Sequence, residues 1–474
     1  MNNLKIQALV VIISVLFLFS CNPFGPHDFG AAGNFWVYDF KKETNYRISA
    51  DLLAEGIFCN VWAERRSGIT AIQAQLIADE YDNKIHLQMI EAFGHENPFY
   101  DGEYFSDIME LACWLSSSDD NKLCILLLDI RDNYQKGVND SYIAGYFWGR
   151  DLYAGQHSNS RTMIYIDTNP GMEPSRFDTV KKTIAHEVQH LINYVTSILL
   201  VHNKIRTGTG YMDTWIDEGL SSAAEFVCFG HSVNRINWYI DNGSGDNNKG
   251  LIDKGNNFFV WDNYRKENIY AILDDYSTVY LFFQWLRLQS GGTDVYREII
   301  TSPYRNHEAV VNAIKDYPDW ETLLKTWLAA NYINAKDGPY GYRGDPELIN
   351  IRAPAPSSIE TDVILAPGEG VYSATDTNGL LPDPGLNIRY AGLDKDSVQV
   401  SDNSVFQNGA LLTYNANINW RTGALEEGKT TGIPIIANTL PAGRSVKPAS
   451  DGPFPIGAAD VLKRIWHEGI HNEE

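Results

Sequence analysis

The sequence has few basic residues relative to its acidic ones. Its 474 residues include 38 Lys and Arg against 60 Asp and Glu, which gives a formal net charge of −22. A nucleic-acid surface needs clustered basic side chains to contact phosphates, so this balance argues against nucleic acid as a partner. The same excess of acids is typical of a soluble, well-hydrated surface.

Beyond its first segment, the sequence also lacks an apolar run long enough to span a bilayer. Residues 6–19 are largely apolar and follow a short positive segment, but they match the hydrophobic part of a signal peptide better than a membrane span. The tetrapeptide Leu18-Phe19-Ser20-Cys21 resembles a bacterial lipobox. We therefore expect residues 1–21 to be a lipoprotein signal peptide, with Cys21 lipidated and anchoring the exported protein to a bacterial membrane, on the periplasmic side or at the cell surface. An ordinary signal peptide that happens to contain Cys21 is the alternative.

Cysteine is scarce, with four residues beyond Cys21: Cys59, Cys113, Cys124 and Cys228. None of them has C-x-x-C spacing, so a zinc site built from cysteines is not expected. An exported chain permits disulfides, and four cysteines allow three pairings. Buried free thiols are an equally good interpretation.

The spacing of apolar residues predicts the secondary structure. Short apolar or alternating runs predict strands at 57–63, 123–130 and 161–167, and an amphipathic helix at 71–81. From Asp178 to about Val201, apolar residues recur at steps of three and four, which predicts a long helix with one apolar face. Further helices are expected at 215–226, 277–289 and 308–334.

The composition changes near residue 340. Proline and glycine become frequent there, and strand-like runs appear at 397–400 and 411–414. We therefore predict a main domain over residues 31–340 and a small β-rich domain of unknown role over 350–474.

The long predicted helix contains a motif of metal ligands, His186-Glu187-Val188-Gln189-His190. Histidines four residues apart on a helix lie one turn apart on the same face, where both can bind a single Zn²⁺ ion. Glu187 lies beside the first ligand, where it can take a proton from a zinc-activated water and deliver it to a leaving amine. The sequence thus predicts one catalytic zinc ion. A structural Ca²⁺ ion is left open, although no motif supports it.

The same five-residue pattern occurs a second time, at His467-Glu468-Gly469-Ile470-His471. Gly469 would stand inside that helix at a cost of about 1 kcal/mol relative to alanine, and charged residues flank the segment. The first copy instead has apolar, helix-compatible neighbours. We therefore assign the metal site to His186 and His190, and interpret the second copy as an accident.

A catalytic zinc ion needs a third protein ligand. The segment 214–225 resembles the W-x-x-E-G glutamate helix of the gluzincin metallopeptidases, a group that includes aminopeptidases and clostridial collagenases. The resemblance implies that Glu218 is the third ligand. Glu225 lies two helical turns further on the same face, where it can hydrogen-bond a ligand histidine. Glu225 as the third ligand is the alternative.

Peptide hydrolysis also needs a donor that stabilises an oxyanion. Several gluzincins have a helix whose first tyrosine is that donor, and the segment beginning at Tyr276 is similar to it. Tyr280 lies one turn further and is the alternative. The chain contains 26 tyrosines, so either residue could simply belong to the core.

The resemblance extends beyond these motifs to the hyicolysin family of metallopeptidases. It covers roughly residues 35–335 and includes the segments 35–37, 126–132, 144–148, 158–167 and 185–194. It implies an α+β, gluzincin-like fold with a sheet above the zinc helix, a helical lower part and a cleft between them. The strand Met163–Asp167 could then form the cleft edge and bind an extended peptide by strand addition. Asp217 departs from the asparagine that often precedes the ligand glutamate in related sequences, a change that could alter contacts with the substrate end.

Taken together, these features predict a zinc-dependent endopeptidase that hydrolyses peptide bonds in proteins outside the cytoplasm. The main alternative is a catalytically weak surface lipoprotein that uses the fold to bind host or envelope molecules. The retained Glu187 argues against this alternative, because a binding protein does not need the catalytic base. An aminopeptidase remains open without a motif for capturing an amine, and the 60 acids form no convincing glycosidase pair.

Overall fold

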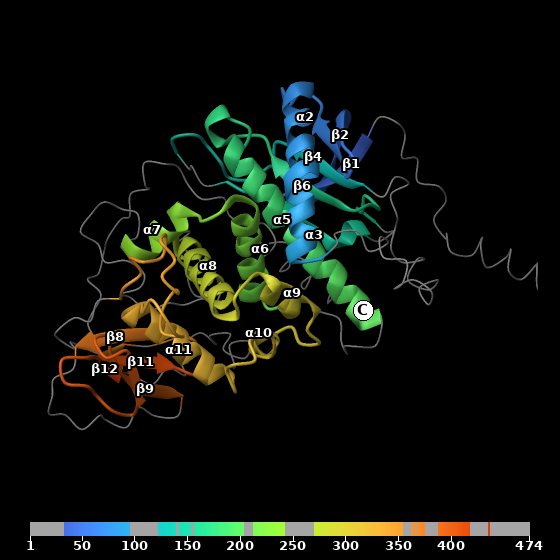
Figure 1. Ribbon diagram of the computed structural model, residues 1–474. Helices are drawn as coiled ribbons and strands as arrows, with labels where there is room; N and C mark the ends of the chain where they lie inside the picture. The colour runs from blue at the N-terminus through green and yellow to red at the C-terminus, as the bar shows by residue number, and fades with distance from the viewer. Residues whose placement is uncertain are drawn as a thin grey trace, which may run out of the picture.

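The computed structural model describes most of the chain between Gly33 and Ile436 (Figure 1). The described residues are 33–94, 122–138, 142–152, 156–202, 212–241, 270–353, 362–363, 365, 367–374, 387–417 and 435–436. Cys21, Cys113 and the second histidine motif at 467–471 lie outside them. Among the described residues, no helix is long and apolar enough to cross a membrane.

The first half of the chain forms a six-stranded mixed sheet with the strand order β1-β2-β3-β4-β6-β5. Its strands are β1 (Gly33–Asp39), β2 (Thr44–Glu55), β3 (Cys59–Glu64), β4 (Leu123–Leu128), β5 (Gly145–Phe147) and β6 (Met163–Asp167). The central strands β3, β4 and β6 are parallel, and β5 pairs antiparallel with β6. The two edge strands are therefore β1 and β5, and β5 is the one next to β6. The prediction that Met163–Asp167 forms the cleft edge is wrong, because β6 pairs with a neighbour on each side.

The central strands β4 and β6 are buried on both faces, which explains why every residue of β4 is apolar and why β6 is apolar up to its last residue, Asp167. One face packs against a helical segment formed by α2 (Ala71–Glu80), the π-helical turn 81–85 and α3 (His86–Ala92), and against the long helix α5 (Phe177–His202). The other face has its own aromatic-rich core, in which the Tyr146 and Tyr165 rings stack at 4.0 Å.

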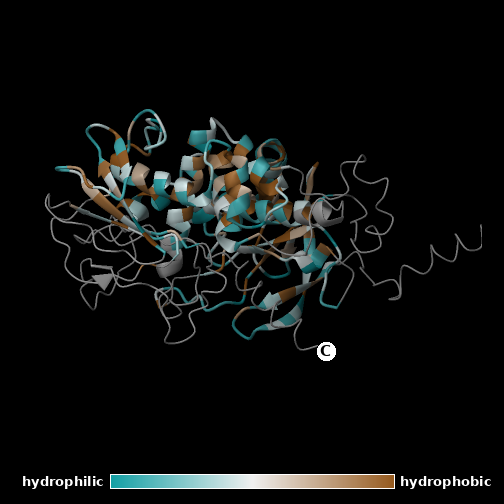
Figure 2. Cartoon of the chain, turned by 90° about the horizontal axis from the view of Figure 1, so that it is seen from below, coloured by the Kyte–Doolittle hydropathy of each residue, from teal (hydrophilic) through white to brown (hydrophobic). Residues whose placement is uncertain are grey.

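Helices from the second half of the chain pack on one another below the sheet, with α6 and α9 directly against α5 (Figure 1). They are α6 (Thr214–Phe229), α7 (Val233–Asp241), α8 (Tyr270–Ser290), α9 (Asp294–Thr301), α10 (His307–Ala313) and α11 (Trp320–Ile333). Hydrophobic and hydrophilic residues alternate around these helices, as amphipathic packing requires (Figure 2). The single helix predicted at 308–334 is wrong. The chain leaves the helix at Ile314, contains Pro318, and starts α11 with Asp319, whose side chain accepts a hydrogen bond from the Thr322 amide.

A second, antiparallel sheet follows α11, with the order β10-β9-β11-β8. Its strands are β8 (Gly370–Ala374), β9 (Ile388–Asp394), β10 (Gln399–Asp402) and β11 (Ala410–Asn415), and a two-stranded pair joins β7 (Asp362–Val363) to β12 (Ile435–Ile436). The Tyr372 hydroxyl donates a hydrogen bond to the Leu328 carbonyl of α11 at 2.7 Å. Buried residues of the sheet, such as Leu412, belong to the same apolar core as the helices. The protein is thus a mixed α/β structure with a second small sheet packed on its last helix.

The described cysteines are free thiols. Cys59, Cys124 and Cys228 are all buried, and no disulfide joins them. Cys59 lies in the core on the face of the sheet that the helices cover, whereas Cys124, on the neighbouring strand, points to the opposite face. For these three residues, the structure agrees with the interpretation as buried thiols.

Candidate metal centre

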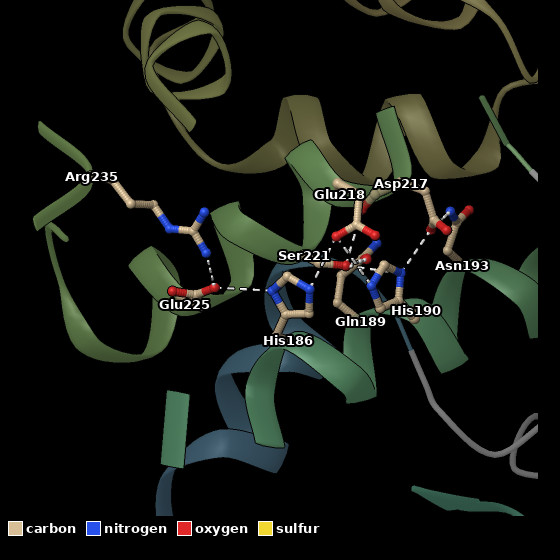
Figure 3. Close-up of polar contacts among 9 residues, drawn as sticks. All are labelled: His186, Gln189, His190, Asn193, Asp217, Glu218, Ser221, Glu225 and Arg235. Carbon is tan, nitrogen blue, oxygen red and sulfur yellow. Dashed lines mark hydrogen bonds and ion pairs between the residues drawn. The ribbon is translucent and has the colours of Figure 1, made fainter. Parts of the chain in front are cut away.

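Two crossing helices bring three potential metal ligands to one point. His186 and His190 lie one turn apart on α5, and Glu218 faces them from α6 (Figure 3). The Oε2 atom of Glu218 lies 3.2 Å from Nε2 of His186 and 3.6 Å from Nε2 of His190. All three side chains are buried, and one ligand atom from each lies within 4.8 Å of the others. Two imidazoles and one carboxylate form the donor set typical of a catalytic zinc site.

The surroundings of these atoms fit a bound cation. Within the described part of the chain, Oε1 of Glu218 and Nε2 of His190 are buried without a hydrogen-bond partner. Buried polar atoms are normally satisfied, so each such atom calls for an explanation, and a metal ion between them supplies one. The residues present therefore fit the metal that the motif predicts.

A glycine allows α6 to pack closely enough to place Glu218. A Cβ atom at Gly219 would lie 2.2 Å from Cε2 of Phe283 on α8, a distance that real atoms do not reach. Glycine inside a helix costs about 1 kcal/mol relative to alanine. Here the glycine is needed because α6 and α8 pack closely at this point. The glycine that follows Glu218 in the motif therefore has a role in packing, beside the chemical role of Glu218.

Each histidine has a carboxylate behind it, on the ring nitrogen that faces away from the cluster. Oε1 of Glu225 lies 2.9 Å from Nδ1 of His186, and Oδ1 of Asp217 lies 3.2 Å from Nδ1 of His190. A carboxylate at Nδ1 holds the proton there and leaves Nε2 free to bind a metal. The contact also shows that Glu225 lies behind His186 rather than among the three clustered ligands.

Further polar side chains surround His190. The Asn193 side-chain amide donates a hydrogen bond to Asp217 Oδ1 at 2.6 Å. Ser221 Oγ lies 3.1 Å from Nδ1 of His190 and donates a hydrogen bond to Gln189 Oε1 at 2.5 Å. These contacts orient both the ring and the carboxylate behind it.

The electrostatics of the cluster favour positive charge between its members. Burial disfavours the charged form of His186, but hydrogen bonds to Glu218 and Glu225 outweigh it and raise its pKa to about 9. Burial also opposes ionisation of His190, yet Asp217 and Glu218 raise its pKa well above the ordinary value. Burial alone would raise the pKa of Glu218, but the two histidines hold it well below its usual range. A site that binds protons this readily also suits a divalent cation.

Glu187 lies next to the cluster on the same helix. It is buried, and its Oε2 atom has no hydrogen-bond partner among the described residues. Burial raises its pKa to about 7, although His186 and His190 act in the opposite direction. A carboxyl group with a pKa near neutrality suits general-base chemistry.

The two candidate tyrosines of α8 differ in their surroundings. The ring of Tyr276 lies 6.2 Å from the ring of His186, centroid to centroid. Tyr280 points elsewhere, since its hydroxyl accepts a hydrogen bond from the Ser232 amide at 3.0 Å and lies 3.0 Å from Nδ1 of His231. Of the two, Tyr276 is the one that the structure brings to the cluster.

Some residues of the site were not identified from the sequence. The sequence could have indicated Asn193, because its spacing from His190 places it one turn further on the same face of the helix. It could not have indicated Ser221 and Arg235, since their contacts depend on how α6 and α7 pack. Arg235 donates a hydrogen bond to Glu225 Oε1 at 2.7 Å. The side chain of Asp217 contacts His190 and Asn193, and these two contacts give no support to the proposed substrate-end role.

Comparison with known proteins agrees with this chemistry. No protein-family model matches the chain. The chain is, however, similar to neutral metalloprotease ShpI of Staphylococcus hyicus, with 30% identity over 368 residues that make up 75% of each protein. A likeness of this identity and extent establishes that the chain belongs to the hyicolysin-like family of metallopeptidases.

Proposed function

We propose that the protein is a zinc endopeptidase of the gluzincin type, with His186, His190 and Glu218 as the metal ligands. The observation that supports this proposal most is the buried cluster of these three side chains, with unsatisfied ligand atoms on Glu218 and His190. Zinc bound there supplies the Lewis acidity that makes water a nucleophile near neutral pH and polarises the substrate carbonyl.

The proposed catalytic base is Glu187. Its Oε2 atom accepts the proton of the attacking water, and the same carboxyl group later delivers a proton to the leaving amine. Its raised pKa, about 7, suits both transfers, because the group gains and loses a proton with little cost near neutral pH. Glu225 and Asp217 hold the ligand imidazoles in the tautomer with the proton on Nδ1.

Tyr276 is the proposed oxyanion donor. Its position beside His186 supports this role, whereas the Tyr280 hydroxyl is engaged by Ser232 and His231. A hydroxyl aimed at the carbonyl oxygen stabilises the negative charge that develops there as water adds.

The substrate backbone is proposed to bind along β5. This strand ends the sheet, so within the described residues its outer edge has no neighbouring strand. An extended peptide can add to such an edge through main-chain hydrogen bonds. The strand also lies next to Glu187, since a Cβ atom at Gly145 would lie 3.2 Å from Cγ of that residue. A peptide bound there would have its scissile bond close to the proposed base.

Export and anchoring remain part of the proposal through the lipobox-like segment that ends at Cys21. A cysteine acylated there would hold the enzyme at a bacterial membrane, facing proteins outside the cytoplasm. Labelling with a radioactive or alkyne-tagged fatty acid tests this directly. Incorporation in the wild type and its loss in Cys21→Ser is the expected result.

The decisive activity test uses the full chain with zinc and a library of peptides blocked at both ends. Endopeptidases cleave such peptides, whereas aminopeptidases need a free amine. We expect cleavage by the wild type and its loss by a factor of about 100 or more in Glu187→Gln, which removes the base but keeps its shape. A wild type that binds zinc but cleaves no peptide would instead favour the binding lipoprotein.

The location of the metal is tested separately. His186→Ala should abolish stoichiometric zinc binding, and His467→Ala should leave it intact. The opposite pattern would move the site to the second motif.

A further inference from the structure

Arg235 of α7 contacts the carboxylate behind a proposed zinc ligand. Its Nη2 atom donates a hydrogen bond to Oε1 of Glu225 at 2.7 Å, and the same oxygen lies 2.9 Å from Nδ1 of His186. Figure 3 shows the three side chains in a row, with Glu225 between the guanidinium and the imidazole. A single oxygen atom thus joins the cation to the histidine.

The guanidinium also touches the proposed oxyanion donor. The Cζ atom of Arg235 lies 5.0 Å from the centre of the Tyr276 ring, a distance typical of a cation–π contact. The Tyr276 ring in turn lies close to the ring of His186. Arg235 therefore contacts two groups that border the same imidazole, one behind it and one beside it.

The charges of the side chains around the cluster also support a role for Arg235. Four buried carboxylates lie in or next to the cluster: Glu218 within it, and Glu187, Asp217 and Glu225 beside it. Arg235 forms an ion pair with one of them, Glu225, at 2.7 Å. Its side chain is 8% exposed, so it is itself buried and unlike a surface charge that solvent screens. A buried carboxylate is costly without a partner, and Arg235 gives Glu225 a fixed one.

We propose that Arg235 is a positioning residue of the metal centre. It holds Glu225 in the orientation that keeps the proton of His186 on Nδ1, and it also packs against the Tyr276 ring. The inference rests on the proposed function, because it assigns His186 to zinc. It predicts that Arg235 acts on zinc affinity through Glu225, although it touches neither metal nor substrate.

The test is a double-mutant cycle on zinc affinity, measured in the full chain by competition with a chromogenic chelator. The proteins are the wild type, Arg235→Gln, Glu225→Gln and the double variant. We expect each single change to weaken zinc binding about 10- to 100-fold, as losses behind a metal ligand do. In the Glu225→Gln background, the Arg235→Gln change should have an effect within about twofold, because the group through which it acts is already gone.

Arg287→Gln is the matched control. Arg287 also pairs with an acid, Asp345, at 3.3 Å, and lies over an aromatic ring, Phe226, at 4.3 Å. Losing it removes the same two kinds of contact away from the cluster, so zinc affinity should stay within about twofold of the wild type. If Arg235→Gln does not fold, Arg235→Lys replaces it in the cycle, with a smaller loss expected because the charge is kept but the planar fork is lost.

Two results would overturn the inference. One is an Arg235 variant with wild-type zinc affinity. The other is a loss that adds fully to that of Glu225→Gln, which would show a general structural effect. The proposed function fails in a different way, since then the wild type would bind no zinc, or His186→Ala would bind it as tightly.

Discussion

Gly145 of the edge strand lies directly against Glu187 of α5. A Cβ atom at position 145 would lie 3.2 Å from Cγ of Glu187, 2.8 Å from the Tyr165 carbonyl oxygen and 2.8 Å from Cγ2 of Thr183. Only a residue without a side chain fits between the strand and the helix. Glycine at position 145 thus allows the proposed peptide-binding strand β5 to lie directly beside the proposed catalytic base.

Gly145→Ala tests this relationship. The added methyl group must push β5 away from α5, which should lower the free energy of unfolding by about 1–3 kcal/mol. It should also lower kcat/KM by up to about 100-fold, because small displacements of a reacting group are costly. Chemical denaturation and cleavage of a blocked peptide measure the two effects.

Gly292→Ala is the control for that change. A Cβ atom there would meet no other atom within 4 Å. The variant should therefore keep both its stability and its activity. If Gly145→Ala left kcat/KM unchanged, the proposal that substrate binds along β5 next to Glu187 would be wrong.

The metal-free protein should lose stability as the pH rises from about 7.5 to 9. The pKa of His186 is raised to about 9, from an ordinary value of 6.5 in the unfolded chain. A raised histidine pKa stabilises the fold fully below the unfolded value and loses that effect as the pH rises through the folded value. Thermal unfolding of chelator-treated protein across this range checks the expectation.

Zinc should change that pH profile. Its two histidine ligands must be neutral, so binding at pH 7.5 releases protons from His186 and His190. Titration calorimetry in buffers of different ionisation enthalpy gives the number released, and we expect more than one. A value near zero would show that the histidines are already neutral before the metal binds.

Asp217 should tolerate asparagine far better than alanine. Its Oδ1 atom lies near Nδ1 of His190 and accepts from Asn193, and the oxygen of an asparagine can accept both hydrogen bonds. We expect Asp217→Asn to keep zinc affinity within about tenfold and Asp217→Ala to lose about 10- to 100-fold. Equal affinities in the two variants would mean that the contact does not orient the ligand.

Much of the site was predictable because its residues lie on two strongly patterned helices. The apolar spacing that predicts a helix from Asp178 to about Val201 also fixes His186 and His190 on one face, and α5 spans Phe177–His202. Residues that depend on packing between helices could not be found in this way. Arg235 meets Glu225 only because α7 returns toward α6, and no spacing within either helix indicates it.

The prediction that Met163–Asp167 forms the edge of the sheet was wrong for a related reason. Met163–Asp167 has the length and apolar character of a strand, whereas β5 has three residues and no periodic pattern. Which strand ends a sheet depends on pairing between distant segments, and neither the family resemblance nor the pattern of a single segment indicates that pairing. The helix predicted at 308–334 is interrupted between Ala313 and Trp320, and Pro318 in that stretch is the local signal against one continuous helix.

Tyr276→Phe and Tyr280→Phe should separate the two roles of the α8 tyrosines. If Tyr276 stabilises the oxyanion, its loss lowers kcat about 100- to 1,000-fold and leaves zinc content and KM near the wild type. Tyr280→Phe instead removes the hydroxyl that contacts Ser232 and His231, at a cost of about 1 kcal/mol in stability with kcat largely kept. Steady-state kinetics on a blocked peptide, together with denaturant unfolding, distinguish these outcomes. A loss of kcat confined to Tyr280→Phe would reassign the donor, because the two side chains lie one turn apart on α8 and face different neighbours.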